Sequence, residues 1–165
     1  MNHLATSKED ILAASRDLIK ENGWAAVSIR AVASRCSVSA GTIYNYYESK
    51  ADLLSDTIES IWHEIFFHPE DEQVFHDVES CISWIYERLE YGNRQFPGFF
   101  SLHSFGFMRD EKTSGKKRMM KTWGHILNGL CEVLGNDPKV RADVFDQEFT
   151  EKKFADILFS LILVS

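Results

Sequence analysis

The sequence predicts an all-α protein, with a short N-terminal group of three helices followed by a larger helical body. Apolar residues recur at intervals of three and four, the spacing of one helix face, whereas the alternation typical of β-strands is scarce. Prolines occur only at positions 69, 97 and 138, and residues that favour helix N-termini precede several apolar runs. The sequence contains no repeats or low-complexity tracts.

Serines mark the starts of the N-terminal helices, and glycine or proline signals mark two of their ends. Ser7 and Asp10 form a capping-box pattern, and Gly23 supplies a stop for the helix that follows. The long fourth helix ends near His68, because the residue before Pro69 resists helical backbone angles. The predicted helices begin after Ser7, Ser28, Ser39 and Ser49 and end near Gly23, Arg35, Tyr46 and His68.

The rest of the chain is predicted to form four more helices, at roughly 72–94, 96–109, 115–135 and 139–164. Break signals separate them at 93–97 and at 135–138, where Gly, Asn, Asp and Pro cluster. We divide the chain into an N-terminal domain at 1–50 and a helical body at 51–165.

Composition excludes several classes of protein. The 165 residues are 44% hydrophobic, which excludes intrinsic disorder and is enough for a real core. The three cysteines are odd in number and far apart, so neither a disulfide framework nor a zinc finger is supported. The polar N-terminus is unlike a secretory signal, and the longest apolar run, within 157–164, is too short to span a bilayer. We expect a cytoplasmic protein with no membrane partner.

The most informative stretch is residues 28–50, SIRAVASRCSVSAGTIYNYYESK. Two short helices joined by a turn of three or four residues form a helix-turn-helix. The close crossing of those helices needs a small residue, then a turn-permissive residue, then an apolar one. Ala33, Ser37 and Ile43 have that spacing.

The second helix of this motif has the composition of a DNA-reading helix. It is uncharged, rich in hydroxyl and amide groups, and small at its N-terminal end, where backbone must approach base edges. Thr42 and Tyr44 can donate hydrogen bonds to phosphates, and Asn45 or Tyr46 could bond to bases. Lys50 opens the next helix, where its charge and the free amides suit a phosphate.

Residues 8–54 resemble the DNA-binding domain of the tetracycline-repressor (TetR) family of transcriptional regulators. The family pattern Gly-Val-Ser-x-x-Thr-hydrophobic-Tyr-x-Tyr/His-Phe-x-x-Lys-x-x-Leu is matched at residues 37–53 by SVSAGTIYNYYESKADL. Two departures from the family's usual residues matter. Ser37 stands where the family has the glycine of the turn, at a cost of about 1 kcal/mol in a left-handed conformation. Ala40 stands where the family often has Lys, Arg or Gln, which leaves the operator sequence open.

The resemblance implies a DNA-binding site on this motif, with phosphate contacts and base contacts. Tyr47 takes the position of the family's packing phenylalanine, so we expect it to point inward. Two alternatives stay open, since Arg30 could be a solvated helix residue and Asn45 could simply face solvent. The predicted DNA-binding residues are Ser28, Arg30, Ser39, Ala40, Gly41, Thr42, Tyr44, Asn45, Tyr46 and Lys50.

The net charge of −7 argues weakly against a nucleic-acid binder, but its distribution matters. Residues 1–52 hold six basic and six acidic side chains, so the whole excess of acid lies in 53–165. An electroneutral N-terminal part joined to an acidic body indicates two functional parts. We expect modest non-specific affinity for DNA, because few phosphates can be neutralised.

The body is rich in aromatic residues between positions 62 and 123. Core packing accounts for many of them, yet apolar ligand pockets are lined in the same way. The resemblance implies a small-molecule effector pocket, and wide aromatic walls suit an apolar or aromatic ligand, with His103 or Arg109 orienting a polar end. The predicted lining residues are Trp62, Trp84, Tyr91, Phe99, His103, Phe105, Met108 and Trp123.

The last predicted helix is strongly apolar. In the family, the last two helices of each subunit build a four-helix dimer interface, and a two-fold DNA site needs two copies of the motif. Because the family continues through one more helix, we expect this chain to be incomplete at its C-terminus. The predicted dimer residues are Phe154, Ile157, Leu158, Leu161 and Ile162.

Motifs of enzymes, metal sites and cofactor sites are lacking. The sequence has no G-x-S-x-G elbow and no G-x-G-x-x-G, and 113–117 lacks the upstream glycine of a Walker loop. No histidine pair has the i, i+4 spacing of a helical zinc site. We expect no catalytic activity, no metal and no cofactor.

These observations predict a ligand-responsive repressor that binds a two-fold operator as a homodimer and is released by a small apolar or aromatic effector. The alternative is a helical DNA-binding and interaction module that a protein partner controls instead of a small ligand.

Overall fold

The computed structural model describes residues 6–67, 76–100 and 114–164, with side chains described at 6–67, 76–100 and 123–161. Every regular element in these ranges is helical, which confirms the predicted all-α class.

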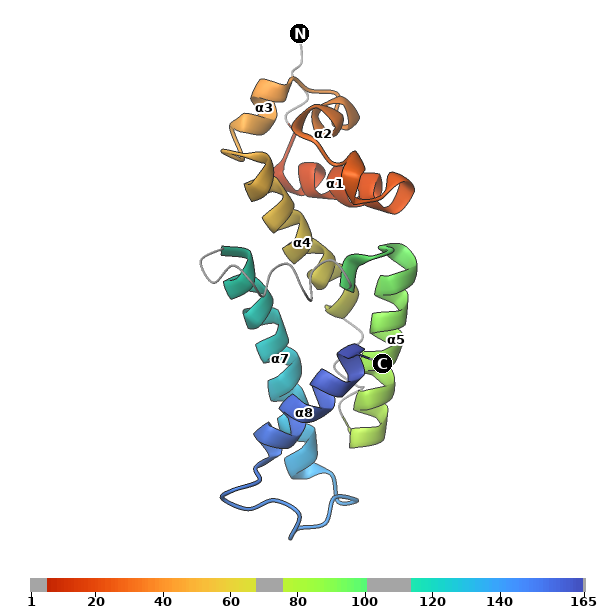
Figure 1. Ribbon diagram of the computed structural model, residues 1–165, viewed down its shortest axis with the longest axis vertical. Helices are drawn as coiled ribbons and strands as arrows, with labels where there is room; N and C mark the ends of the chain where they lie inside the picture. Colours follow the sequence, from red (N-terminus) through yellow and green to blue (C-terminus); the bar gives the residue numbers. More distant parts are fainter. Residues whose placement is uncertain (1–5, 68–75, 101–113, 165) are drawn as a thin grey trace.

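Eight helical elements follow one another along the described chain (Figure 1). The N-terminal domain holds α1 (Lys8–Asn22), the short 3-10 helix η1 (Trp24–Ala26), α2 (Ile29–Arg35) and α3 (Ala40–Tyr44). The long helix α4 (Lys50–Phe66) leads into the body, which holds α5 (Val78–Gln95), α7 (Ser114–Asn136) and α8 (Glu151–Val164).

The four predicted serine caps are present. Ser7 accepts the backbone N–H of Asp10 at 3.1 Å, and the Asp10 carboxylate accepts the N–H of Ser7 in return, which completes the capping box. Ser28, Ser39 and Ser49 each accept the N–H three residues ahead, at 3.1–3.2 Å. These bonds satisfy backbone donors that the first turn of a helix leaves without a partner.

The structure corrects one predicted helix start in the body. The helix expected at 139–164 begins only at Glu151, and the residues before it form turns. Asp137 accepts the backbone N–H groups of Val78 and Lys139, at 2.9 and 2.8 Å, and Asp146 accepts those of two residues that follow it. Aspartates that bond to nearby backbone favour turns over helix, and these bonds hold the loop open as far as Thr150.

Smaller corrections concern the other elements. Helix α3 ends at Tyr44, two residues before the expected end, and α5 starts at Val78 behind its cap Asp77. Of the helix expected at 96–109, residues 96–98 form a bend and turn, residues 99 and 100 are helical as expected, and 101–109 lie outside the described residues.

Helix α4 joins the two parts of the molecule. In Figure 1 it runs from the N-terminal helices at one end down to α5 and α7 at the other, with the 137–150 loop farthest from the N-terminal domain. It packs on α1 on the upper side and on α5 and α7 on the lower side. Leu53, Ile61 and Ile65, spaced along its length, are all fully buried.

The close packing of α4 on α5 depends on Gly92. A Cβ atom at position 92 would lie 2.6 Å from Ile65 Cδ1 and 2.9 Å from Phe100 Cζ. Both distances are shorter than carbon atoms tolerate, so any side chain at position 92 would require Ile65 and Phe100 to move.

We predict that Gly92→Ala lowers the free energy of unfolding by about 1–3 kcal/mol, because Ile65 and Phe100 must move to admit the methyl group. Chemical denaturation of the purified chain measures this. Gly124→Ala in α7 is the control, since nothing lies within 4 Å of its Cβ position, and stability there should stay equal or rise by up to about 1 kcal/mol. Equal effects of the two substitutions would contradict the close-packing argument.

Candidate nucleic-acid interface

Helices α2 and α3 pack against each other as a helix-turn-helix. The residues predicted for their crossing lie inside, with Ala33 3% and Ile43 0% exposed. The chain leaves α2 through a tight turn in which the Val38 N–H donates to the Ala33 carbonyl at 2.9 Å. The local signals at 28–50 thus produce the motif that they predicted.

Ser37 adopts the left-handed conformation that its place in the turn requires, with φ at 57°. Among the described residues other than glycine it alone has positive φ. A side chain in this region costs roughly 1–2 kcal/mol, which is why glycine is preferred there. The predicted strain at this departure from the family pattern is therefore present.

All ten predicted DNA-binding residues reach the surface of this domain. Seven are exposed, with Tyr44 at 56% and Tyr46 at 43%, and the other three are half-buried. Tyr47 is only 4% exposed and belongs to the core, as predicted. The exposed members are Arg30, Ser39, Gly41, Tyr44, Asn45, Tyr46 and Lys50.

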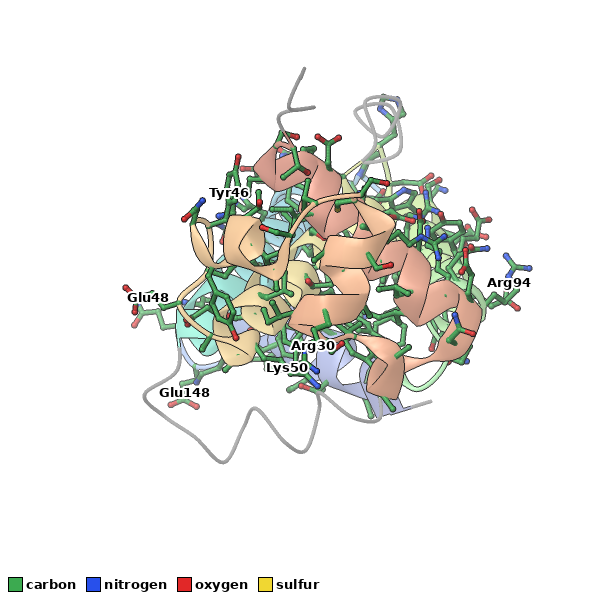
Figure 2. All side chains as sticks on the ribbon, turned by 90° about the horizontal axis from the view of Figure 1, so that it is seen from above. Arg30, Tyr46, Glu48, Lys50, Arg94 and Glu148 are labelled. Carbon is green, nitrogen blue, oxygen red and sulfur yellow. The ribbon has the colours of Figure 1, made fainter. Side chains whose placement is uncertain are left out.

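The basic side chains of this region differ in whether they form ion pairs within the protein. Four of the six in residues 1–52 are paired within the protein, which leaves Arg30 and Lys50 without an ion pair in the described part of the chain. In Figure 2, which looks onto the N-terminal domain, Arg30 and Lys50 extend toward the same edge. The paired side chains are Lys8, Arg16, Lys20 and Arg35.

Arg35 illustrates the paired state. Its guanidinium donates two hydrogen bonds to the Glu21 carboxylate, the Nη1 bond at 2.6 Å, and this charge-assisted pair lowers the pKa of Glu21. The pair ties α2 to α1, so Arg35 is occupied in holding the domain together. Arg30 lies on the same helix and makes no such bond among the described residues.

Some of the predicted contact groups already have partners in the protein. The hydroxyls of Ser28 and Ser39 cap α2 and α3, and Ser39 Oγ also lies 3.0 Å from Thr42 Oγ1. Tyr46 donates its hydroxyl hydrogen to the Thr6 carbonyl at 2.6 Å. Sequence reasoning missed that bond, because the two residues are forty positions apart. It secures the chain before α1 to the helix-turn-helix and leaves the face of the ring exposed.

In the body, the structure brings several predicted ligand-binding residues together. Trp62 is 2% exposed and its ring lies 5.1 Å from Phe99 and 5.7 Å from Trp123, centroid to centroid. Trp84 joins the cluster through Phe66 at 5.9 Å. Tyr91 stands apart, with its hydroxyl 3.4 Å from the Glu64 carboxylate. His103, Phe105 and Met108 lie outside the described residues.

The described rings of this aromatic cluster pack against one another. The buried Nε1 groups of Trp62 and Trp123 have no hydrogen-bond partner in the described structure. Sequence reasoning did not include Phe66 and Phe100, which also touch Trp62, at 5.6 Å each. Their spacing alone could not separate them from ordinary core residues.

Two open clefts of about 430 and 510 Å³ lie elsewhere. The smaller cleft is bounded by Val78, Ile82 and Val140, near the start of α5. The larger lies between α1 and α4, with Leu12 and Phe67 among its walls. Neither is lined by a residue predicted for the effector pocket.

The predicted dimer residues on α8 form one partly open face. Ile157 is 51% and Leu161 59% exposed, whereas Phe154 and Leu158 are half-buried. The side chain of Ile162 lies outside the described part. The opposite face of α8 packs on α7, with Phe159 5.4 Å from the ring of Trp123.

Two further features were searched for in the described ranges. No three His, Cys, Asp or Glu side chains gather there in a way that could hold a metal ion. No helix in those ranges is long and apolar enough to cross a membrane.

Comparison with known proteins identifies the N-terminal domain. The part of the chain that forms the helix-turn-helix is the part that matches. Residues 11–57 match the family described as bacterial regulatory proteins, tetR family, which confirms the resemblance predicted from the motif.

Curated relatives match over the same part of the chain. The HTH-type transcriptional regulator UidR of Escherichia coli (strain K12) is 38% identical over 48 residues, 29% of this chain and 24% of that protein. The HTH-type transcriptional repressor KstR of Rhodococcus jostii (strain RHA1) is 45% identical over 47 residues, 28% of this chain and 22% of that protein. The match thus spans about a quarter of the length of these relatives.

Solved structures share the fold along nearly the whole chain. The transcriptional regulator FadR of Bacillus subtilis, in complex with stearoyl-CoA, superposes with a TM-score of 0.59 at 18% identity, over 96% of this chain and 84% of that one. A TetR transcriptional regulator from Legionella pneumophila reaches 0.61 at 20% identity, over 99% and 86%. At these identities the likeness is one of fold.

We predict that Ser37→Gly raises the free energy of unfolding by about 1 kcal/mol, because glycine adopts positive φ without the steric cost. Thermal or chemical denaturation measures it. Ser34→Gly is the matched control, since Ser34 is exposed inside α2, where glycine should lower stability by about 0.5 kcal/mol. A loss of stability at both positions would show that Ser37 is not strained.

We also predict that Lys50→Ala weakens DNA binding about equally on all sequences and lowers the slope of log affinity against log salt by about one unit. The reason is that Lys50 lies at the exposed start of α4 without an ion pair among the described residues, free to neutralise a phosphate. Lys152→Ala, which removes an equally exposed lysine from α8, should leave affinity and slope unchanged. An unchanged slope for Lys50→Ala would contradict the predicted contact between Lys50 and a DNA phosphate.

Proposed function

We propose that this chain is a ligand-responsive transcriptional regulator of the cytoplasm, a repressor that binds a two-fold operator as a homodimer. Residues 1–50 form its DNA-binding domain and residues 51–165 its effector-binding and dimerisation domain. The observation that carries the proposal is the pairing pattern of the N-terminal cations. Four of the six pair with carboxylates of the protein, and the two that have no ion pair among the described residues, Arg30 and Lys50, come before and after the recognition helix in the chain.

The exposed residues of the motif have distinct proposed roles. Ser28, Thr42, Tyr44 and Lys50 contact phosphates and set the position of α3 in the major groove. Base edges are read by the residues on and beside α3 and by one arginine of α2. Because α3 is only five residues long and uncharged, one copy contacts few base pairs. The proposed base-reading residues are Arg30, Ala40, Gly41, Tyr44, Asn45 and Tyr46.

A dimer supplies the specificity that one such helix lacks. Two copies reading successive major grooves place their recognition helices ~34–36 Å apart on a two-fold site. The exposed face of α8, with Ile157 and Leu161 more than half exposed, supports its use as a subunit interface. Burial of that face against a second copy would remove the largest exposed aliphatic side chains of α8 from water.

In this proposal an effector acts through α4 to release the operator. Trp62 lies on α4 within the aromatic cluster, and α4 also begins beside the recognition helix. Two buried indole N–H groups without partners offer donors to a ligand that enters between the rings. A shift of α4 would alter the spacing of the recognition helices and release the operator. The stearoyl-CoA bound to the FadR neighbour supports a ligand with a long apolar part.

A second candidate is a DNA-binding module controlled by a protein partner. The close packing of the described aromatic rings and the position of both clefts outside them favour this reading over a preformed ligand pocket.

The first test is binding of the purified chain to the DNA upstream of its own gene, across a salt series, with molecular mass measured in parallel. We expect saturable binding of a dimer to a two-fold site. Binding of the same strength to unrelated DNA would contradict the repressor proposal.

The second test addresses the effector. Apolar and aromatic ligands are titrated against the protein–DNA complex, and a true effector lowers operator affinity. By linkage, operator DNA must then weaken ligand binding by the same factor. A ligand that saturates the protein and leaves operator affinity unchanged is not the effector, and if no ligand of these classes acts, the partner-controlled module replaces the proposal.

A further inference from the structure

Besides the apolar packing of α1 on α4, two ion pairs along one face of α1 link the N-terminal domain to α4. Lys8 Nζ lies 2.5 Å from Asp56 Oδ2, and Arg16 Nε lies 2.9 Å from Glu64 Oε2. The two contacts are eight residues apart on both helices, which corresponds to about 12 Å along each axis. A single contact would let α1 rotate about it, whereas two separated contacts restrict the orientation of α1 relative to α4.

Glu64 is the more highly connected of the two carboxylates. Its Oε2 pairs with Arg16, and its Oε1 pairs with Lys20 at 2.6 Å and lies 3.4 Å from the Tyr91 hydroxyl of α5. Arg16 is further held by Ser60 Oγ at 2.8 Å. One carboxylate therefore joins α1, α4 and α5, the helices of both parts of the molecule.

These ion pairs are partly shielded from water. The side chains of Arg16, Lys20 and Glu64 are 17%, 28% and 23% exposed. Charges in such a setting attract each other more strongly than fully solvated ones and are less screened by salt. A carboxylate whose two oxygens both bind cations is also held in fewer orientations than a carboxylate in a single exposed ion pair.

Aromatic contacts extend the same junction. The Trp24 ring stacks on Phe99, with centroids 5.7 Å apart and planes at 13°, and Lys20 Nζ lies 4.9 Å above the Phe96 ring. Phe99 in turn touches Trp62 within the aromatic cluster. The end of α1 therefore rests on residues that the proposed effector would disturb.

We propose that Glu64 is the positioning residue that fixes the direction of the DNA-binding domain on the body. It lies away from the predicted DNA contacts and outside the aromatic cluster, and it acts through Arg16 and Lys20. The inference rests on the proposed function, because direction matters only if two recognition helices must meet one operator. Its structural part, the orientation itself, can be measured without DNA or effector.

Orientation and stability respond differently to the loss of this carboxylate. The N-terminal helices bury Ile11, Val32 and Ile43, all 0% exposed, in an apolar core that continues along α4 into the body. Ion pairs that are partly exposed contribute little to folding compared with such a core. Removal of the Glu64 charge should therefore let the orientation of the N-terminal domain relative to the body vary, while both parts stay folded.

The test is Glu64→Gln, which keeps the size of the side chain and removes its charge, in the 165-residue chain. Residual dipolar couplings are measured for the backbone N–H groups of α1–α3 and of α4–α5. In the unsubstituted protein both sets should fit one alignment tensor. In Glu64→Gln we expect a second tensor, or smaller couplings, for α1–α3. A single shared tensor in the variant overturns the proposal.

Glu90→Gln is the matched control. Glu90 lies exposed on α5 beside Tyr91, and its substitution removes the same charge. It should leave one shared tensor and an unchanged unfolding midpoint. Lys20→Gln and Arg16→Gln test the same junction from α1, and each should loosen the domain and add little in a Glu64→Gln background. Fully additive effects would show that Glu64 does not act through them.

DNA binding supplies the second readout. On the DNA upstream of the gene, Glu64→Gln should lose about three- to tenfold in affinity with an unchanged salt slope, because no phosphate contact is removed. Lys50→Ala instead changes the slope, so the two roles separate. An unchanged affinity for Glu64→Gln, or a reduced slope, overturns the positioning role. Absence of specific binding by the unsubstituted chain contradicts the proposed function, while the tensors still decide the orientation.

Discussion

The burial of α4 on two sides is the constraint on which the rest of the structure depends. Near its start Leu53 is fully buried, and near its end Ile65 lies against Gly92 so closely that no Cβ fits. A single rigid helix thus belongs to both packed groups. The helix runs without a break from Lys50 to Phe66, and five residues separate its start from the recognition helix α3 (Figure 1).

Some N-terminal cations form ion pairs within the protein, and others remain at its surface. A net charge of −7 is unfavourable for DNA binding. In addition, four of the N-terminal cations are paired with carboxylates of the protein. Arg30 and Lys50 are the N-terminal cations that no carboxylate of the described residues pairs with, and both extend toward one edge of the domain (Figure 2). Long-range attraction to DNA is therefore weak, and the proposed recognition depends on short-range contacts of tyrosine, threonine and amide groups near α3.

Local signals predicted much of this molecule. The serine caps, the turn at Ser37 and the inward position of Tyr47 were all predicted from spacing and from the family pattern, because each depends on a few neighbouring residues. The same reasoning failed at 139–150, where Asp137 bonds to backbone of α5, nearly sixty residues away. Likewise, spacing predicted an aromatic body but not which rings would meet.

The sequence by itself determined the helical class, the helix-turn-helix and its likeness to the tetR family, because periodicity, caps and turn residues act over a few positions. Only the tertiary structure decided which charges are free, since Lys8 and Arg16 find their carboxylates more than forty residues away. It also decided that Glu64 joins three helices and that Tyr46 bonds to the chain before α1. Pairings of that kind depend on how helices cross, and no local pattern encodes a crossing.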